Sequence, residues 1–115
     1  DAAATNDKGI YPLGAPGERF PYNDASKKPV LPPRDGGDRA AVLADLLVGI
    51  ADVERLGYAA LKERGASPLK AVATAGGGAR NPQWAALRSN LLGVDVVRAA
   101  NSDAAFGAAV LALRG

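Results

Sequence analysis

The sequence predicts an α/β fold, in which short apolar strands alternate with helices around a parallel sheet. Segments rich in valine and alanine alternate with stretches in which apolar residues recur every three or four positions. Three consecutive glycines, Gly76, Gly77 and Gly78, join one predicted strand directly to a helix. Because a helix connects the two predicted strands, we expect them to run parallel with a right-handed crossover.

Residues 1–37 are predicted to form an extended and looped segment, separate from a second region, 38–115. The first region holds six of the eight prolines, which argue against a long helix there. From Asp38 onward the apolar spacing changes to that of a helix, which runs from an N-cap at Asp38 to a C-terminal glycine at Gly65. The charged residues on this helix are expected to form a solvated face, and they include Asp45, Asp52, Arg55, Lys62 and Glu63.

A strand over residues 69–75, a helix over 82–92 and a second strand over 94–98 are predicted next, with Asn81 and Gly93 as the caps of the helix. A last helix begins at Ser102 or Asp103 and ends near Leu113. Because residues 104–113 carry no polar side chain, we expect it to be buried on nearly all sides. Two strands cannot cover such helices, so the sheet is predicted to be incomplete. Copies of the chain are expected to associate through the exposed sheet edge or by exchanging elements.

Composition narrows the range of functions. With 115 residues and 48% apolar content, the chain can bury one modest core. Acidic and basic residues are interspersed at a net charge of +2, and aromatic residues are few, so nucleic acid is not an expected partner. No apolar run is long enough to span a bilayer and no signal-peptide pattern opens the chain, which predicts a soluble, cytoplasmic protein without a membrane partner.

The absence of cysteine and histidine excludes disulfides, thiolate nucleophiles, imidazole bases and Cys/His metal sites within these residues. Methionine is absent too, even at position 1, which indicates a fragment of a longer protein.

The glycine run is consistent with a loop that binds a phosphate or a nucleotide, since glycines let a ligand approach the backbone and the dipole of the following helix attracts anions. It is equally consistent with a tight turn whose glycines serve only the close packing of strand against helix. A P-loop is excluded because no lysine follows the glycines. A dinucleotide fingerprint fits Gly76 and Gly78 but has Asn81 in place of the third glycine. Arg98, twenty residues after Gly78, is either a ligand for the 2′-phosphate of NADP or a surface residue. An NADP-binding Rossmann-type fragment and a non-catalytic structural or interaction module both remain alternatives.

Three motifs in order resemble the C-terminal portion of the FGGY carbohydrate kinases, of the ribulokinase- or xylulokinase-like branch. They are Thr-Ala-Gly-Gly-Gly-Ala-Arg-Asn-Pro-Gln-Trp at residues 74–84, Leu-Gly-Val-Asp-Val-Val at 92–97 and Ser-Asp-Ala-Ala-Phe-Gly-Ala-Ala at 102–109. Tyr-Pro-Leu at 11–13 and Gly-Glu-Arg-Phe-Pro at 17–21 also resemble that branch. Asp95 stands where the family often has proline.

This resemblance implies an ATPase lobe of the actin, Hsp70 and hexokinase type (ribonuclease H-like) and an enzyme that transfers a phosphoryl group from ATP to a small ketose such as ribulose or xylulose. Gly76, Gly77 and Gly78 would lie beneath the nucleotide, with Gly77 and Gly78 nearest to adenine and ribose. Asn81 would lie near the α-phosphate or ribose, and Trp84 would form a wall of the adenine pocket. The catalytic aspartate, the Mg²⁺ ligands and most sugar contacts would belong to other parts of the kinase, so this chain alone is expected to be inactive.

Each residue proposed to bind the nucleotide could also have a purely structural role. Trp84 shares a helical face with Leu87 and Leu91 and is equally consistent with a core residue. Asn81 is equally consistent with a helix cap only. Arg80 and Arg88 are interpreted as surface charges and not as phosphate ligands.

Overall fold

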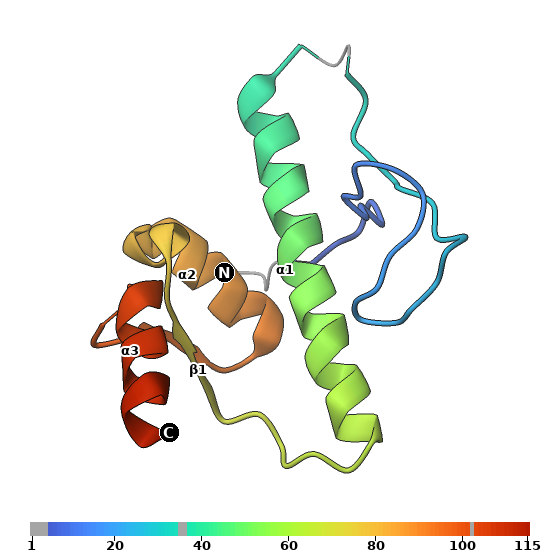
Figure 1. Ribbon diagram of the computed structural model, residues 1–115. Coiled ribbons are helices and arrows are strands. Elements are labelled where there is room, and N and C mark those ends of the chain that lie inside the picture. The colour runs from blue at the N-terminus through green and yellow to red at the C-terminus, as the bar shows by residue number, and fades with distance from the viewer. Residues whose placement is uncertain (1–4, 35–36, 102) are drawn as a thin grey trace. The chain divides into compact units, whose positions relative to one another are not determined.

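The computed structural model describes residues 5–34, 37–101 and 103–115, in the element order drawn in Figure 1. Three α-helices, α1 (Arg39–Glu63), α2 (Pro82–Leu92) and α3 (Ala104–Arg114), occur in this part of the chain with two strands, β1 (Ala71–Thr74) and β2 (Asp95–Arg98). A 3₁₀-helix, η1 (Gly77–Arg80), precedes α2. The chain forms two compact units, Asp1–Pro68 and Leu69–Gly115. The α/β class is confirmed, whereas the predicted domain boundary after residue 37 stays a prediction.

The ends of α1 lie where the sequence predicts them, because both depend on local chemistry. The Asp38 carboxylate accepts hydrogen bonds from the N–H groups of Ala40 and Ala41. At the other end Gly65 has a φ of +92°, and the N–H of Ala66 donates to the Leu61 carbonyl. This pair of features is the Schellman motif, which satisfies carbonyls that the last helical turn would leave without donors.

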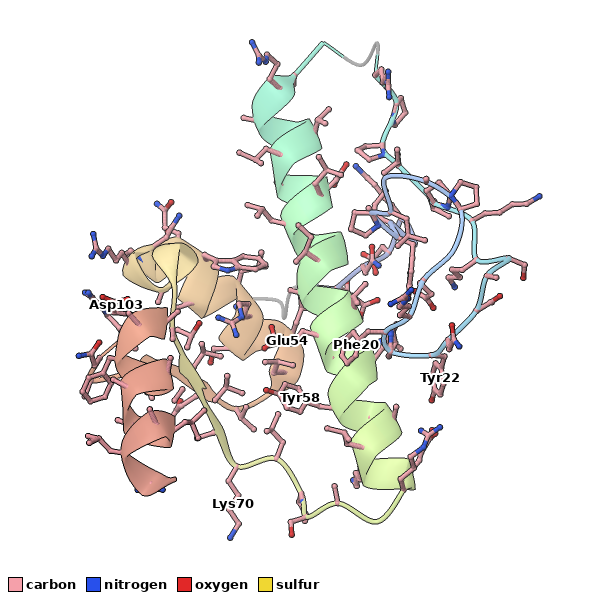
Figure 2. The ribbon with its side chains drawn as sticks, in the orientation of Figure 1. Phe20, Tyr22, Glu54, Tyr58, Lys70 and Asp103 are labelled. Atoms are coloured by element: carbon pink, nitrogen blue, oxygen red, sulfur yellow. The ribbon has the colours of Figure 1, made fainter. Side chains whose placement is uncertain are left out.

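The segment before α1 packs on the helix at two glycines. A Cβ atom at Gly49 would lie 2.7 Å from Ile10 Cγ2, and one at Gly57 would collide with the ring of Phe20. Figure 2 shows Phe20 beside α1, and the Tyr22 hydroxyl donates a 3.2 Å hydrogen bond to Glu63, the last residue of the helix. The segment also pairs with itself through the bridge between Tyr11 and Val30. Small helix residues therefore let the irregular segment lie close to α1.

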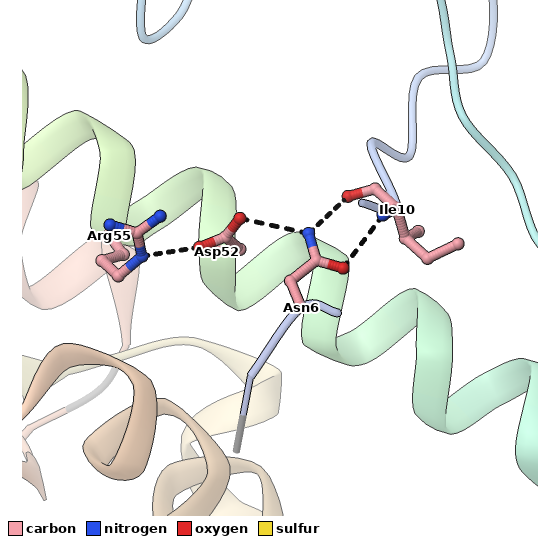
Figure 3. Close-up of polar contacts among 4 residues, drawn as sticks. All are labelled: Asn6, Ile10, Asp52 and Arg55. Atoms are coloured by element: carbon pink, nitrogen blue, oxygen red, sulfur yellow. Dashed lines mark hydrogen bonds and ion pairs between the residues drawn. The ribbon is translucent and has the colours of Figure 1, made fainter. Parts of the chain in front are cut away.

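One predicted solvated charge on α1, Asp52, instead holds this segment in place, which corrects the sequence prediction. Its Oδ2 accepts a hydrogen bond of 3.1 Å from Asn6 Nδ2, and its Oδ1 pairs with Arg55 at 2.6 Å (Figure 3). Asn6 in turn bonds the backbone N–H and carbonyl of Ile10. The Asp52 side chain is only 16% exposed, because a residue 46 positions earlier covers it.

The second unit is built on a parallel pair of strands, with Ala71 opposite Asp95 and Thr74 opposite Arg98. Both strands are shorter than predicted, but their order and direction agree with the prediction. Val72 and Thr74 are buried, so one face of β1 contributes to the core. Helix α2 contacts β2, begins after Asn81 and ends at Gly93, which takes the left-handed conformation with φ of 69°. These limits match the predicted ones.

Helix α3 is not buried, contrary to the prediction. Its Phe106, Leu111 and Leu113 are 51%, 72% and 88% exposed. An apolar helix is buried only when another layer packs on it, and none does so among the described residues. Asp103 caps the helix by accepting a hydrogen bond from Ala105 N–H, while the other predicted cap, Ser102, lies outside the described residues. Within the described ranges, no helix has the length and apolar character needed to cross a membrane.

Candidate functional site

The glycine turn leaves the sheet at Thr74, the last residue of β1. The Thr74 carbonyl accepts a hydrogen bond of 2.9 Å from the N–H of Ala99, so the end of the strand is tied to the chain that follows β2. Gly76 then has φ of 89° and ψ of −174°, a conformation that is accessible almost only to glycine. The turn itself therefore requires a glycine at position 76.

The other two glycines lie in η1, where the backbone does not require glycine. Neither has a positive φ. A Cβ atom at Gly77 would meet nothing within 4 Å, and one at Gly78 would make only an ordinary contact of 3.4 Å with Trp84 Cδ1. Both are exposed. Since glycine weakens a helical segment relative to alanine, these two residues incur a cost that the described structure does not explain.

Their backbone N–H groups are also available. Within residues 5–34, 37–101 and 103–115, the N–H groups of Gly77 and Gly78 meet no acceptor, whereas those of Ala79 and Asn81 bond back to the carbonyls of Gly76 and Gly78. The loop thus offers two exposed donors at the positions where the backbone is bare.

The first turn of α2, in contrast, has no free donor. Pro82 has no N–H, and Asn81 Oδ1 accepts from the N–H groups of Gln83 at 3.0 Å and Trp84 at 3.2 Å. The Asn81 carbonyl accepts from Ala85. The predicted cap is confirmed, and it occupies the N–H groups that an anion would use. Because Oδ1 is committed to the cap, the atom of Asn81 left for a ligand is the donor Nδ2.

Trp84 lies at the edge of the glycine loop, with the Cδ1 and Nε1 side of its indole against Gly78. It is half-buried, as are Leu87 and Leu91 on the same helix. The ring therefore packs partly into the unit and leaves part of its surface open. Both interpretations made from the sequence, a core residue and a pocket wall, agree with this partial burial.

Arg88 is the residue that sequence reasoning missed. We expected a surface charge, but only 8% of Arg88 is exposed. Its Nη1 donates a 2.7 Å hydrogen bond to Thr74 Oγ1, and its guanidinium carbon lies 5.8 Å from the centre of the Trp84 ring. The spacing of four residues between Trp84 and Arg88 was the available signal, because side chains at i and i+4 share a helix face.

The structure brings Gly78, Asn81 and Trp84 together at the start of α2, directly after Gly76 and Gly77. A separate open groove of about 560 Å³ is lined by residues of η1, α2 and β2, including Arg80 and Arg98, and by none of the five predicted ligand-binding residues. In the described part of the chain, no group of three or more acidic side chains is placed to hold a metal ion. The arrangement can contact a flat ring and hydrogen-bond acceptors, but it contains no acid or base for a proton transfer.

Comparison with protein-family models gives a match over residues 1–115. The matching model is described as the C-terminal domain of the FGGY family of carbohydrate kinases.

Proposed function

The chain belongs to the FGGY family of carbohydrate kinases, and we propose that it forms the adenosine-binding side of the ATP cleft in an enzyme that phosphorylates a small ketose. The family phosphorylates sugars with ATP, and its C-terminal domain implies an actin-like ATPase fold, of which this chain is a small α/β piece. Ribulose and xylulose are the proposed substrates, on the resemblance of the motifs at residues 11–21 to that branch.

The observation that carries this proposal is the pair of glycines at 77 and 78. Both have a backbone conformation that alanine adopts readily, and both are exposed. A ligand that lies directly on the main chain accounts for the missing side chains, because a methyl group there would separate it from the N–H groups.

Adenosine fits the chemistry of the surrounding groups. The half-buried indole of Trp84 supplies an aromatic wall for the base, next to Gly78. The free N–H groups of Gly77 and Gly78 and the Nδ2 of Asn81 are donors suited to ribose or α-phosphate oxygens. The role of this chain is to bind and orient the nucleotide.

The chemical step requires groups from elsewhere in the kinase. We propose that an aspartate outside these residues takes the proton of a sugar hydroxyl, whose oxygen then attacks the γ-phosphorus of ATP and displaces ADP. Mg²⁺, which we also expect to be held by residues outside this chain, would neutralise the charge of the phosphates. We assign no catalytic residue and no metal ligand to this chain, and we expect it to be inactive alone.

Substitution of Trp84 by alanine in the complete kinase tests the proposal. We expect the KM for ATP to rise and the KM for the sugar to stay unchanged, because only the base loses a contact. Gln83→Ala is the matched control, since Gln83 is the exposed neighbour of Trp84 and only its backbone takes part in the cap. An unchanged KM for ATP in Trp84→Ala would remove Trp84 from the site.

Two other functions are separated by direct binding measurements on the same protein. An NADP-binding fragment would use Arg98, which is exposed at the end of β2. Calorimetric titration with ATP and with NADPH distinguishes the two nucleotides. A structural or docking module, suggested by the exposed apolar side chains of α3, would bind neither and would form oligomers that sedimentation detects.

A further inference from the structure

Arg88 occupies a position that costs free energy. It is 8% exposed, as is its hydrogen-bond partner Thr74. A guanidinium that leaves water loses hydration, and hydrogen bonds recover only part of that loss. An apolar side chain of similar length, such as methionine, would fill the same space without this cost. The arginine therefore requires an explanation other than packing.

Two of its contacts converge on the glycine loop from opposite ends. The hydrogen bond of 2.7 Å reaches Thr74, two residues before Gly76, whose φ is positive. The guanidinium carbon lies 5.8 Å from the centre of the Trp84 ring, whose Cδ1 edge lies against Gly78. Arginine can make both contacts at once, because its planar guanidinium stacks on aromatic rings while its edge donates hydrogen bonds. Lysine offers the charge without the planar group.

We propose that Arg88 is a positioning residue for the nucleotide: it holds the indole of Trp84 at the edge of the glycine loop and thereby sets the affinity for ATP. This inference rests on the proposed role of Trp84 as the adenine wall. With the guanidinium over one face of the indole, the opposite face is the one on which a base stacks. If the Trp84 side chain is already held in one rotamer, it loses less conformational entropy when the ligand binds. Its burial separates Arg88 itself from the ligand, so it acts through Trp84.

The variants that test this inference in the complete kinase are Arg88→Met, Arg88→Lys and Thr74→Val. Arg88→Met removes the charge and the plane but keeps the length, and we expect the KM for ATP to rise severalfold with the KM for the sugar unchanged. Arg88→Lys should restore part of the loss. Thr74→Val removes the acceptor while leaving Arg88 intact, so it remains informative if either Arg88 variant fails to fold. Equal changes in both KM values would indicate a purely structural role and would overturn the inference.

The environment of Trp84 gives a readout that does not depend on the nucleotide. Subtracting the near-ultraviolet circular dichroism of the matching Trp84→Phe protein isolates the Trp84 signal in each background. We expect this signal to weaken in Arg88→Met, because the ring is no longer held in one orientation. An unchanged signal would show that Arg88 does not position the ring.

A double-mutant cycle separates failure of this inference from failure of the proposed function. If Arg88 acts through Trp84, adding Arg88→Met to Trp84→Ala should not raise the KM for ATP further. Additive effects would overturn the inference while leaving Trp84 in the site. If Trp84→Ala alone leaves the KM for ATP unchanged, the proposed role of Trp84 as the adenine wall fails and the affinity part of this inference fails with it.

Discussion

Replacing Gly77 by alanine should strengthen the fold and weaken ATP binding at the same time. Gly77 lies in η1 without a positive φ, and a Cβ atom there would meet nothing within 4 Å. Alanine at such a position restricts the unfolded chain more than glycine does. We therefore expect the free energy of unfolding to rise by about 0.4–1 kcal/mol.

The effect on the nucleotide has the opposite sign. A base or ribose in contact with bare backbone would meet a methyl group at Gly77 and would have to move away by about 1 Å, and a misplacement of that size can lower a rate by about 100-fold. We expect kcat/KM for ATP to fall by about 10- to 100-fold, which corresponds to about 1.4–2.7 kcal/mol of transition-state binding. The KM for the sugar should change little.

Two glycines serve as controls for this substitution. Gly107 lies in α3 and has no positive φ, and a Cβ atom there would also meet open space, so Gly107→Ala makes the same change in another helix. Gly76→Ala forces a side chain into a φ of 89° and should destabilise the protein. Urea unfolding and steady-state kinetics of the complete kinase measure both effects. A Gly77→Ala enzyme with raised stability and unchanged ATP kinetics would show that no ligand lies on this backbone.

Two further predictions concern Asn81 and Tyr11. Asn81→Asp keeps the cap oxygen but loses the Nδ2 donor, so the melting temperature should hold while the KM for ATP rises; Asn81→Ala should in addition lose about 1 kcal/mol of stability. Burial and the hydrogen bond to Glu18 raise the pKa of Tyr11 to about 12, above its ordinary value of 10.0. Folding therefore favours the protonated phenol, and this contribution to the free energy of unfolding is present below pH 10 and is lost as the pH rises toward 12. Urea unfolding at pH 10 and at pH 12 should show a smaller loss of stability in Tyr11→Phe than in the parent protein. Equal losses would show that Tyr11 is not the group whose titration destabilises the fold.

The helix ends could be predicted from the sequence because their causes are local. Asp38 and Asn81 accept hydrogen bonds from N–H groups only two and three residues further along the chain. Gly65 and Gly93 take positive φ values that glycine adopts at little cost. In each case the residue type and its immediate neighbours determine the conformation, whatever the rest of the chain does.

The burial of charged residues could not be predicted, since its causes are distant in sequence. The buried Arg88 donates a hydrogen bond to Thr74, which is 14 residues earlier, and Asp52 accepts one from Asn6, which is 46 residues earlier. From the sequence alone we interpret Arg88 as a surface charge and place Asp52 on the solvated face of its helix. The same limitation applies to α3, where apolar composition predicts burial but only a packing partner can produce it.

The glycine loop and the first turn of α2 are adjacent in the sequence, but only the loop has backbone N–H groups open to a ligand. From the sequence, three adjacent glycines and a helix start suggest an anion bound at the first turn of α2. That turn has no N–H left, because Asn81 and the missing N–H of Pro82 account for all its donors. An anion would have to displace the Asn81 side chain and lose the cap, at a cost of about 1 kcal/mol. Contact with the free N–H groups of Gly77 and Gly78 avoids that loss, and it places the ligand next to Trp84. Only a ligand with both a flat apolar ring and nearby acceptor oxygens uses both features, which is why a nucleoside end fits this loop better than an isolated phosphate.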